Sequence, residues 1–273
     1  MSRINDRKLK VMFFYSDIAL IYYILPAIGF IVGLFGTMLG GGGGFIFLPV
    51  LTLMLHVPAS VAVATSLVAT LPICMVGVLG HVKGKNIAFN IVPVFLLMGV
   101  AGTFAGAAIA GRISSERLKA AFGIYAILIA GNILYSTWRK KKKEQAVQKQ
   151  RGWMKITKGS FFGLMAGLIT GAFGANGTAP VLAGLFSMDI PLKRVIGTSL
   201  LVVLVNTAFA VGAHALVGQI DLTLVYFLSA GSALGAILGP RLLLKANVGS
   251  SENKIRYGYA AVMVAIGILM IIK

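Results

Sequence analysis

Residues 33–49 read GLFGTMLGGGGGFIFLP, so five consecutive glycines, Gly40 to Gly44, separate two apolar runs. A five-glycine run cannot hold a regular helix firmly, because glycine loses more backbone freedom on ordering than any other residue. Non-helical backbone at membrane depth is tolerated only where protein encloses it or where it lines a wet cavity. The apolar run that follows, 45–55, is too short to cross a bilayer. We therefore predict a broken helix followed by a re-entrant half-helix.

The chain around this segment has the composition of an integral membrane protein. Of its 273 residues, 58% are hydrophobic and only 12% are charged, which is far outside the range of soluble domains. A transmembrane helix needs about 20 apolar residues. Eight segments meet or approach that length: 18–39, 60–80, 88–110, 118–138, 158–174, 194–216, 222–244 and 255–272. The expected fold is all-α, with about eight transmembrane helices.

A second break indicates an internal duplication. Gly174-Ala175-Asn176-Gly177 precedes another short apolar run, 178–188, which we predict to be a second re-entrant half-helix. Several residues of the first half recur in the second half 133 positions later, as Pro58 and Pro191 or His81 and His214 show. Thr65-Ser66-Leu67 recurs in the same way as Thr198-Ser199-Leu200. Gly40 and Gly43 align with Gly171 and Gly174 at an offset of 131. The predicted repeats are 1–138 and 158–273, and a basic linker, 139–157, joins them.

The charge distribution selects an orientation for the spans. With four spans per half, each short run returning to its own side and the N-terminus inside, Lys and Arg divide 16 inside to 9 outside. If the short runs crossed, the halves would be inverted five-span units and the count would become 8 inside to 17 outside. The positive-inside rule favours the first arrangement. We therefore predict two parallel four-span repeats in the cytoplasmic (inner) membrane, with the linker and both termini in the cytoplasm.

The two breaks are candidate anion sites. The first N–H groups of a helix lack internal partners and carry the positive end of its dipole, so they favour a negative ligand. Side-chain hydroxyls and amides that follow each break can add donors, although a hydroxyl can also bond its own helix. The predicted substrate-binding residues are Gly41, Gly42, Gly43, Gly44, Thr65, Ser66, Asn176, Gly177, Thr178, Thr198, Ser199 and Asn206.

Other residue patterns exclude several kinds of chemistry. No Asp or Glu lies deep within a predicted span, which disfavours a carboxylate relay or an acidic cation site. His81 and His214 remain possible proton carriers, with an interfacial structural role as the alternative. The single cysteine, Cys74, allows no disulfide framework, and no His and Cys cluster has metal-ligand spacing. We expect no cofactor, no metal site and no enzymatic activity.

The motifs resemble those of the TauE/SafE family, also called the sulfonate uptake permease superfamily. The resemblance rests on 33–49, on Ala64-Thr65-Ser66-Leu67 and on Gly80-His81, and it extends from about Phe30 to Leu269. The second half repeats the pattern through Gly171 to Pro180, Gly197-Thr198-Ser199-Leu200 and His214, but Ala172, Ala175 and Asn176 replace glycines there. The resemblance implies a permease or exporter of small anions, chiefly sulfite, sulfonates and related organic acids.

The expected function is secondary or facilitated transport of a small anion through a site between the repeats near the midplane. A membrane-embedded scaffold or accessory subunit is the main alternative, and a channel is a third. The expected partners are the anionic solute and the lipid bilayer, and homo-oligomerisation stays open. The net charge of +18 does not indicate nucleic-acid binding, because the basic residues lie in short loops between apolar runs.

Overall fold

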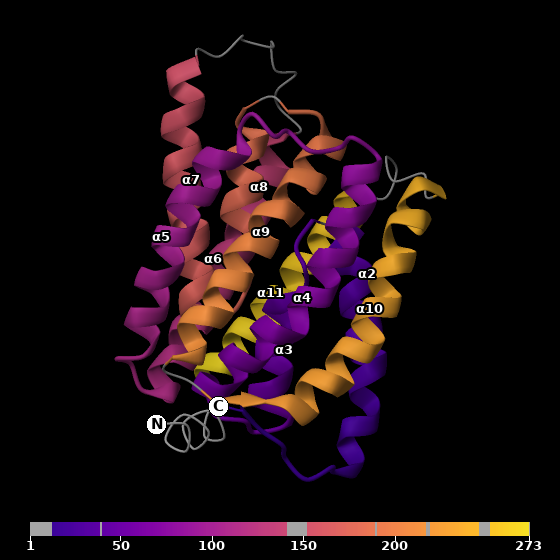
Figure 1. The fold of residues 1–273 in the computed structure, drawn as a ribbon, viewed down its shortest axis with the longest axis vertical. Helices are drawn as coiled ribbons and strands as arrows, with labels where there is room; N and C mark the ends of the chain where they lie inside the picture. Colours follow the sequence, from indigo (N-terminus) through magenta and orange to yellow (C-terminus); the bar gives the residue numbers. More distant parts are fainter. Residues whose placement is uncertain are drawn as a thin grey trace, which may run out of the picture.

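The computed structural model describes residues 13–38, 40–140, 152–188, 190–216, 219–245 and 252–272. Most of them are helical, and the described residues also include short connections and one parallel pair of two-residue strands, β1 and β2 (Figure 1). The elements in chain order are β1 (Phe13–Phe14), η1 (Leu20–Ile24), α2 (Leu25–Met38), α3 (Gly44–Pro49), η2 (Val50–Met54), α4 (Ala59–Lys83), α5 (Val92–Ala110), α6 (Ser115–Lys140), α7 (Gly152–Phe173), α8 (Thr178–Phe186), α9 (Leu192–Ala215), β2 (Ile220–Asp221), α10 (Leu222–Lys245) and α11 (Glu252–Ile272).

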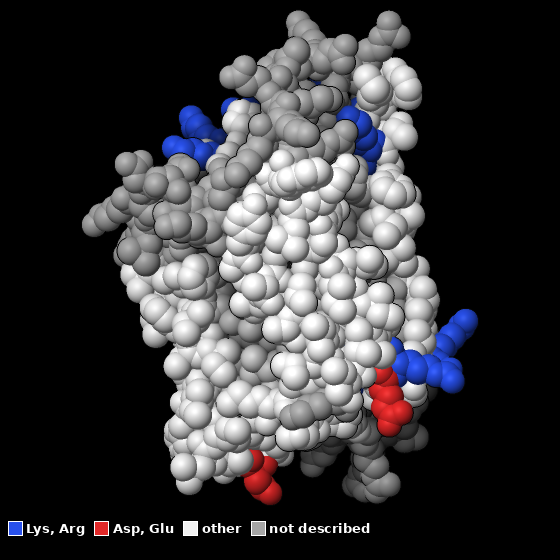
Figure 2. All heavy atoms as spheres, turned by 180° about the vertical axis from the view of Figure 1, so that it is seen from behind, with Lys and Arg blue, Asp and Glu red and all other residues white. Residues whose placement is uncertain are grey.

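The prediction of an all-α membrane protein is confirmed. Within the described ranges, seven helices are long and apolar enough to cross a bilayer, namely η1 with α2, α4, α5, α6, α7, α9 and α10. The eighth predicted span corresponds to α11, whose apolar part, Ala260–Ile272, is shorter. Figure 2 shows the described Lys, Arg, Asp and Glu side chains at the two ends of one face, with an uncharged band between them. That band is where lipid would cover the surface.

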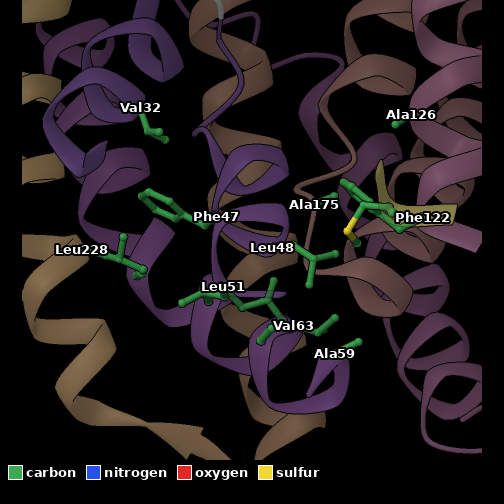
Figure 3. Packing of buried hydrophobic residues seen from close by; sticks show 14 of the residues in the cluster. Val32, Phe47, Leu48, Leu51, Ala59, Val63, Phe122, Ala126, Ala175 and Leu228 are labelled. Atoms are coloured by element: carbon green, nitrogen blue, oxygen red, sulfur yellow. The ribbon is translucent and has the colours of Figure 1, made fainter. Parts of the chain in front are cut away.

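The first short run turns back after α2 and packs mainly against α4, the helix that follows it. After α2 ends, Gly40, Gly42 and Gly43 adopt left-handed backbone with φ of +74°, +61° and +78°, a conformation that disfavours most side chains. The chain then runs through α3 and, after Pro49, through the π-helical segment η2. Phe47, Leu48 and Leu51 of this return segment pack among residues of neighbouring helices, including Val32, Val63 and Leu228 (Figure 3). Protein therefore encloses the broken backbone, as membrane depth requires.

The two halves exchange their first helices. α2 packs along α10 of the other half, with Gly29 against the Leu228 carbonyl and Gly33 against the Ser232 carbonyl. Both residue numbers rise together, so the two helices are parallel. The corresponding pair is α7 with α5, where Gly163 meets Phe95 and Gly167 meets Gly99. Small residues allow helix backbones to approach closely in membranes. These glycines therefore serve helix packing, and the same contacts recur in both halves.

Corresponding helices of the two halves run antiparallel, so the predicted parallel arrangement is wrong. In α4 and α9, Gly77 lies beside Leu200 and Gly197 lies beside His81, so one sequence number rises as the other falls. In α6 and α11, Gly123 contacts Ile271 and Gly267 contacts Ile127, with the same antiparallel sense. Parallel repeats about an axis along the membrane normal would place corresponding helices in the same direction. The halves are therefore inverted with respect to each other.

The reason for this difference is the path of the short runs. In Figure 1, α2 begins at the lower end, and α3 with η2 brings the chain back there before α4 starts. Each half therefore starts and ends on opposite sides of the helix bundle. α6 ends and α7 begins at the upper end, while α11 ends at the lower end (Figure 1). The linker therefore does not share one side with the start of α2 and the end of α11, in contrast to the predicted arrangement. The linker itself lies mostly outside the described residues.

The backbone also corrects the alignment of the two breaks. The left-handed residues of the second break are Gly174, Asn176 and Gly177. They match Gly40, Gly42 and Gly43 at an offset of 134 in residue number, since 174 minus 40 and 176 minus 42 both give 134, and not at the predicted 131. Conformation, rather than glycine identity, defines the correspondence. Asn176 therefore occupies the position of Gly42.

Candidate functional site

The two breaks meet inside the helix bundle. A Cβ on Gly44, the first residue of α3, would lie 2.7 Å from Asn176 Nδ2 and 2.8 Å from the Gly174 carbonyl oxygen. Gly44 begins α3 and Thr178 begins α8, so both short helices start at this junction. We call the residues 40–44 and 174–178 the break junction.

Polar side chains of the second half hold the first break. Ser199 Oγ donates to the Gly40 carbonyl at 2.9 Å, and the single Thr178 Oγ1 proton is shared between the Gly41 carbonyl at 3.0 Å and the Asn176 carbonyl at 2.9 Å. Asn176 Nδ2 donates more weakly to the same Gly41 oxygen at 3.4 Å, and Thr207 Oγ1 donates to Asn176 Oδ1 at 3.3 Å. The structure thus brings Gly41, Asn176, Thr178 and Ser199 together, as expected for a shared site.

The break junction is closed and tightly packed. Asn176 and Ser199 are 0% exposed, and Gly40 to Gly44 are buried. A Cβ on Gly42 would lie 2.6 Å from Cys74 Sγ and 2.9 Å from Asn176 Nδ2, and one on Gly43 would overlap Val32. Thr178 is partly exposed, but a solute can reach the buried groups only when the helices around them move apart. The conformation is therefore one in which the junction is occluded.

The electrostatics of the break junction favour a negative ligand. The N-termini of α3 and α8 bring the positive ends of two helix dipoles to the junction, each worth about 0.3 to 2 kcal/mol to a nearby anion. In the described part of the chain, the acidic residues are Asp17, Glu116, Asp221 and Glu252, and all lie at helix ends or in connections. No fixed negative charge of a described residue therefore offsets these dipoles within a span.

Two predicted site residues bind the backbone outside the junction. Thr65 Oγ1 accepts a hydrogen bond from the Asp221 N–H at 3.1 Å, and Thr198 Oγ1 accepts one from the Ala88 N–H at 2.9 Å. The two contacts correspond in the repeat. Thr65 holds the connection that precedes α10, and Thr198 holds the one that precedes α5. We interpret both as structural.

Ser66 reaches the second break without donating to it. Its Oγ donates to the Val63 carbonyl at 2.8 Å, while a Cβ on Gly174 would lie 2.8 Å from the same Oγ. Ser66 and Ser199 therefore each lie against the break of the opposite half, at Gly174 and Gly40. The symmetry predicted for this pair is present, but only Ser199 donates to a break carbonyl.

The two histidines lie apart from the break junction. His214 is 5% exposed and its Nε2 lies 2.6 Å from the Gly171 carbonyl oxygen of α7. His81 is partly exposed near the end of α4, and its Nδ1 has no partner among the described residues. A role for either in proton coupling stays a prediction.

Sequence reasoning missed Cys74 and Thr207. Neither is among the predicted site residues, yet Cys74 lies against Gly42, and Thr207 bonds the Asn176 side chain. The two occupy corresponding positions of the repeat, since 207 minus 74 gives the same offset of 133. An alignment of the two halves that pairs Gly42 with Asn176 would also have paired Cys74 with Thr207, and it would have indicated that both lie at the breaks.

Comparison with known sequences identifies the family. The sequence model of the sulfite exporter TauE/SafE family matches residues 25–270, which is most of the chain. The chain belongs to the TauE/SafE family. No solved structure matches this TauE/SafE protein.

Relatives of this TauE/SafE protein are named as membrane transporters, not enzymes. It is 27% identical over 240 residues to the probable membrane transporter protein YdhB of Bacillus subtilis, covering 84% of this chain and 94% of the relative. It is 25% identical over 271 residues to a probable membrane transporter protein of Methanocaldococcus jannaschii, covering 94% of this chain and 97% of the relative. The TauE/SafE protein is accordingly a multi-pass membrane transporter.

Proposed function

We propose that this protein carries small anions, such as sulfite, sulfonates or related organic acids, across the cytoplasmic membrane by secondary or facilitated transport. The observation that carries the proposal is the break junction. Two interrupted helices from inverted halves meet there with their N-termini and with the donors of Ser199, Thr178 and Asn176. Secondary transporters of other folds place substrate sites at such interrupted helices between inverted repeats.

The donors of the junction are already in use in the occluded conformation. Ser199, Thr178 and Asn176 all donate to the carbonyls of Gly40 and Gly41. An entering oxyanion would take over these donors, and each exchanged hydrogen bond has a net value of about 0.5 to 1.5 kcal/mol. Binding would thus release the contacts between the two breaks. This exchange supports a carrier whose halves move relative to each other when the solute binds.

The basic residues support a definite orientation in the membrane. In the inverted arrangement, segments at the end that holds the linker carry 17 Lys and Arg, and those at the end that holds the termini carry 8. The positive-inside rule then assigns the linker to the cytoplasm and both termini to the outer side. This orientation retains the predicted side of the linker and reverses that of the termini.

The orientation is tested with reporter fusions. We expect a green fluorescent protein inserted after Gln148 in the linker to fluoresce, because it stays in the cytoplasm, and an alkaline phosphatase fused after Lys273 to be active outside it. Phosphatase activity from the linker insertion, with a fluorescent C-terminal fusion, would contradict the proposed orientation while leaving the inverted fold unaffected.

The transport proposal is tested in proteoliposomes that contain the purified protein. We expect saturable uptake of labelled sulfite and methanesulfonate, and none of choline or a divalent metal cation. Folded protein that moves none of these anions would favour the scaffold alternative. Uptake that rises without saturation at channel-like rates would favour a channel.

The single cysteine provides an independent measure of solute binding. Because Cys74 is buried against Gly42, we expect N-ethylmaleimide to label it slowly and a bound anion to slow the labelling further. Methanesulfonate is the suitable probe, since sulfite itself reacts with maleimides, and Cys74→Ser controls for labelling elsewhere. Protection by choline, or none by any small oxyanion, would argue against an anion at the junction.

A further inference from the structure

Asn206 is a buried amide without a hydrogen-bond partner. Its side chain is 1% exposed, and neither Nδ2 nor Oδ1 has a partner among the described residues. An amide carries two donors and an acceptor, and leaving such a group unsatisfied in the interior is costly. Nearly all buried polar side chains in proteins are satisfied, so an exception needs a reason. A ligand or a water that occupies the position in another state is such a reason.

The location of Asn206 connects it with the break junction. Its neighbour in α9, Thr207, donates to Asn176 Oδ1. On the other side, a Cβ on Gly99 of α5 would lie 2.5 Å from Asn206 Oδ1 and 2.8 Å from Nδ2. Gly99 packs on Gly167, and the neighbouring Ala166 packs on Gly177, the N-cap residue of the helix α8. The amide therefore lies in the contact between α9 and α5, and its neighbour Thr207 connects it with Asn176 of the junction.

The other half offers no counterpart to this amide. At the repeat offset of 133, the position of Asn206 corresponds to Ile73, which is buried and apolar. The position of Gly99 corresponds to Ser232, whose Oγ donates to the Ser229 carbonyl. The unsatisfied amide is thus confined to the α5 and α9 side of the junction. A solute that moves between the halves could therefore bind this amide on that side, whereas the corresponding position of the other half is apolar.

We propose that Asn206 is a specificity-determining residue that selects anions carrying a hydrogen-bond donor, such as a hydroxyl group, next to the anionic group. This inference rests on the proposed anion transport. The junction supplies donors for the anionic oxygens, whereas Oδ1 of Asn206 is an acceptor that a bare oxyanion cannot satisfy. A hydroxyl on the solute both donates to Oδ1 and accepts from Nδ2, so it satisfies both ends of the amide.

The test compares two solutes that differ in one hydroxyl group, 2-hydroxyethanesulfonate and ethanesulfonate. Wild-type protein in proteoliposomes should prefer the hydroxylated anion in kcat/KM by about tenfold, which is the upper range for one net hydrogen bond. Asn206→Leu should abolish the preference, bringing the ratio of the two kcat/KM values to about one. Asn132→Leu makes the same chemical change on the exposed face of α6 and should leave the preference intact.

Thermal stability separates this role from a structural one. Because Asn206 makes no hydrogen bond to a described residue in the occluded conformation, Asn206→Leu should unfold at a temperature equal to or above that of wild type. A lower Tm together with an unchanged preference would overturn the proposal, since the amide would then serve the fold or hold a water. Asn206→Ala provides the same preference measurement if the leucine variant does not fold.

The failures of the two proposals are distinguishable. Equal transport of both sulfonates by the wild type would overturn the role of Asn206 and leave anion transport intact. Transport of neither sulfonate, nor of sulfite, would overturn the proposed function and this inference with it.

Discussion

Gly42→Asn is expected to lower the free energy of unfolding by about 3 kcal/mol, which is the upper range for overpacking a tightly packed interior. Asparagine tolerates the left-handed backbone that this position requires, as Asn176 itself does, so the penalty arises from packing. The new side chain would overlap Cys74 Sγ and Asn176 Nδ2, which lie 2.6 and 2.9 Å from an ideal Cβ. The measurement is thermal unfolding of the detergent-purified protein, together with its yield as a monodisperse species.

The inverted correspondence of the two breaks predicts a rescue. Asn176→Gly removes the side chain that occupies the space, and its position corresponds to Gly42. The double variant Gly42→Asn with Asn176→Gly should therefore recover at least half of the lost stability. Adding Cys74→Thr and Thr207→Cys would reproduce in the first break the hydrogen bond that Thr207 makes to Asn176. Full stability of the single Gly42→Asn variant would contradict the packing of one break on the other.

Asn176→Asp is expected to reduce anion transport by at least about a hundredfold while keeping nearly the same side-chain shape. A carboxylate placed among the N-termini of α3 and α8 repels an anion about 4 Å away by about 4 kcal/mol at the effective dielectric constant typical of proteins. That energy corresponds to about a thousandfold in binding. The measurement is the initial rate of methanesulfonate uptake at neutral pH, with recovery expected as acid protonates the new carboxylate.

Two comparisons isolate the effect of charge at this position. Asn90→Asp introduces the same charge in an exposed turn and should leave uptake unchanged. Asn176→Gly removes the hydrogen bonds to Gly41 and from Thr207 without adding charge, and glycine tolerates the left-handed backbone, so it measures the loss of the amide side chain without charge. Normal uptake by Asn176→Asp would mean that the solute does not pass the break junction.

The helical segments could be predicted from the sequence because their signals are local. The predicted span 60–80 became α4 (Ala59–Lys83), and the half-helix 45–55 became α3 with η2, Gly44–Met54. The second half-helix, 178–188, became α8 (Thr178–Phe186). The length of an apolar run and the glycine or proline residues at its ends predict where such a helix begins and ends to within a few residues. Gly41, Asn176 and Thr178 of the junction, and Ser199 that bonds to it, were among the predicted substrate-binding residues, and their role in binding stays a prediction.

The direction of the repeats and the partners of the hydroxyl groups depend on tertiary contacts. The positive-inside count was applied with the N-terminus inside, and the same charges fit the inverted fold when the orientation is reversed. Thr65 and Thr198 looked equivalent to Ser66 and Ser199 in sequence, but one residue of helix rotation turns them toward Asp221 and Ala88. The alignment of the breaks failed because left-handed backbone, which Asn176 shares with glycine, is not visible in residue identity.

The exchange of first helices has a consequence for the synthesis of the protein. α2 is among the first segments to leave the ribosome, but its close-packed partner α10 begins only at Leu222. Until then, the glycine face of α2, at Gly29 and Gly33, has no backbone to pack against. A nascent chain that stops before α10 therefore cannot complete its first half, and quality-control proteases should recognise it as unfinished. Assembly in the membrane must wait for nearly the whole chain, so contacts that are far apart in sequence should make folding slow.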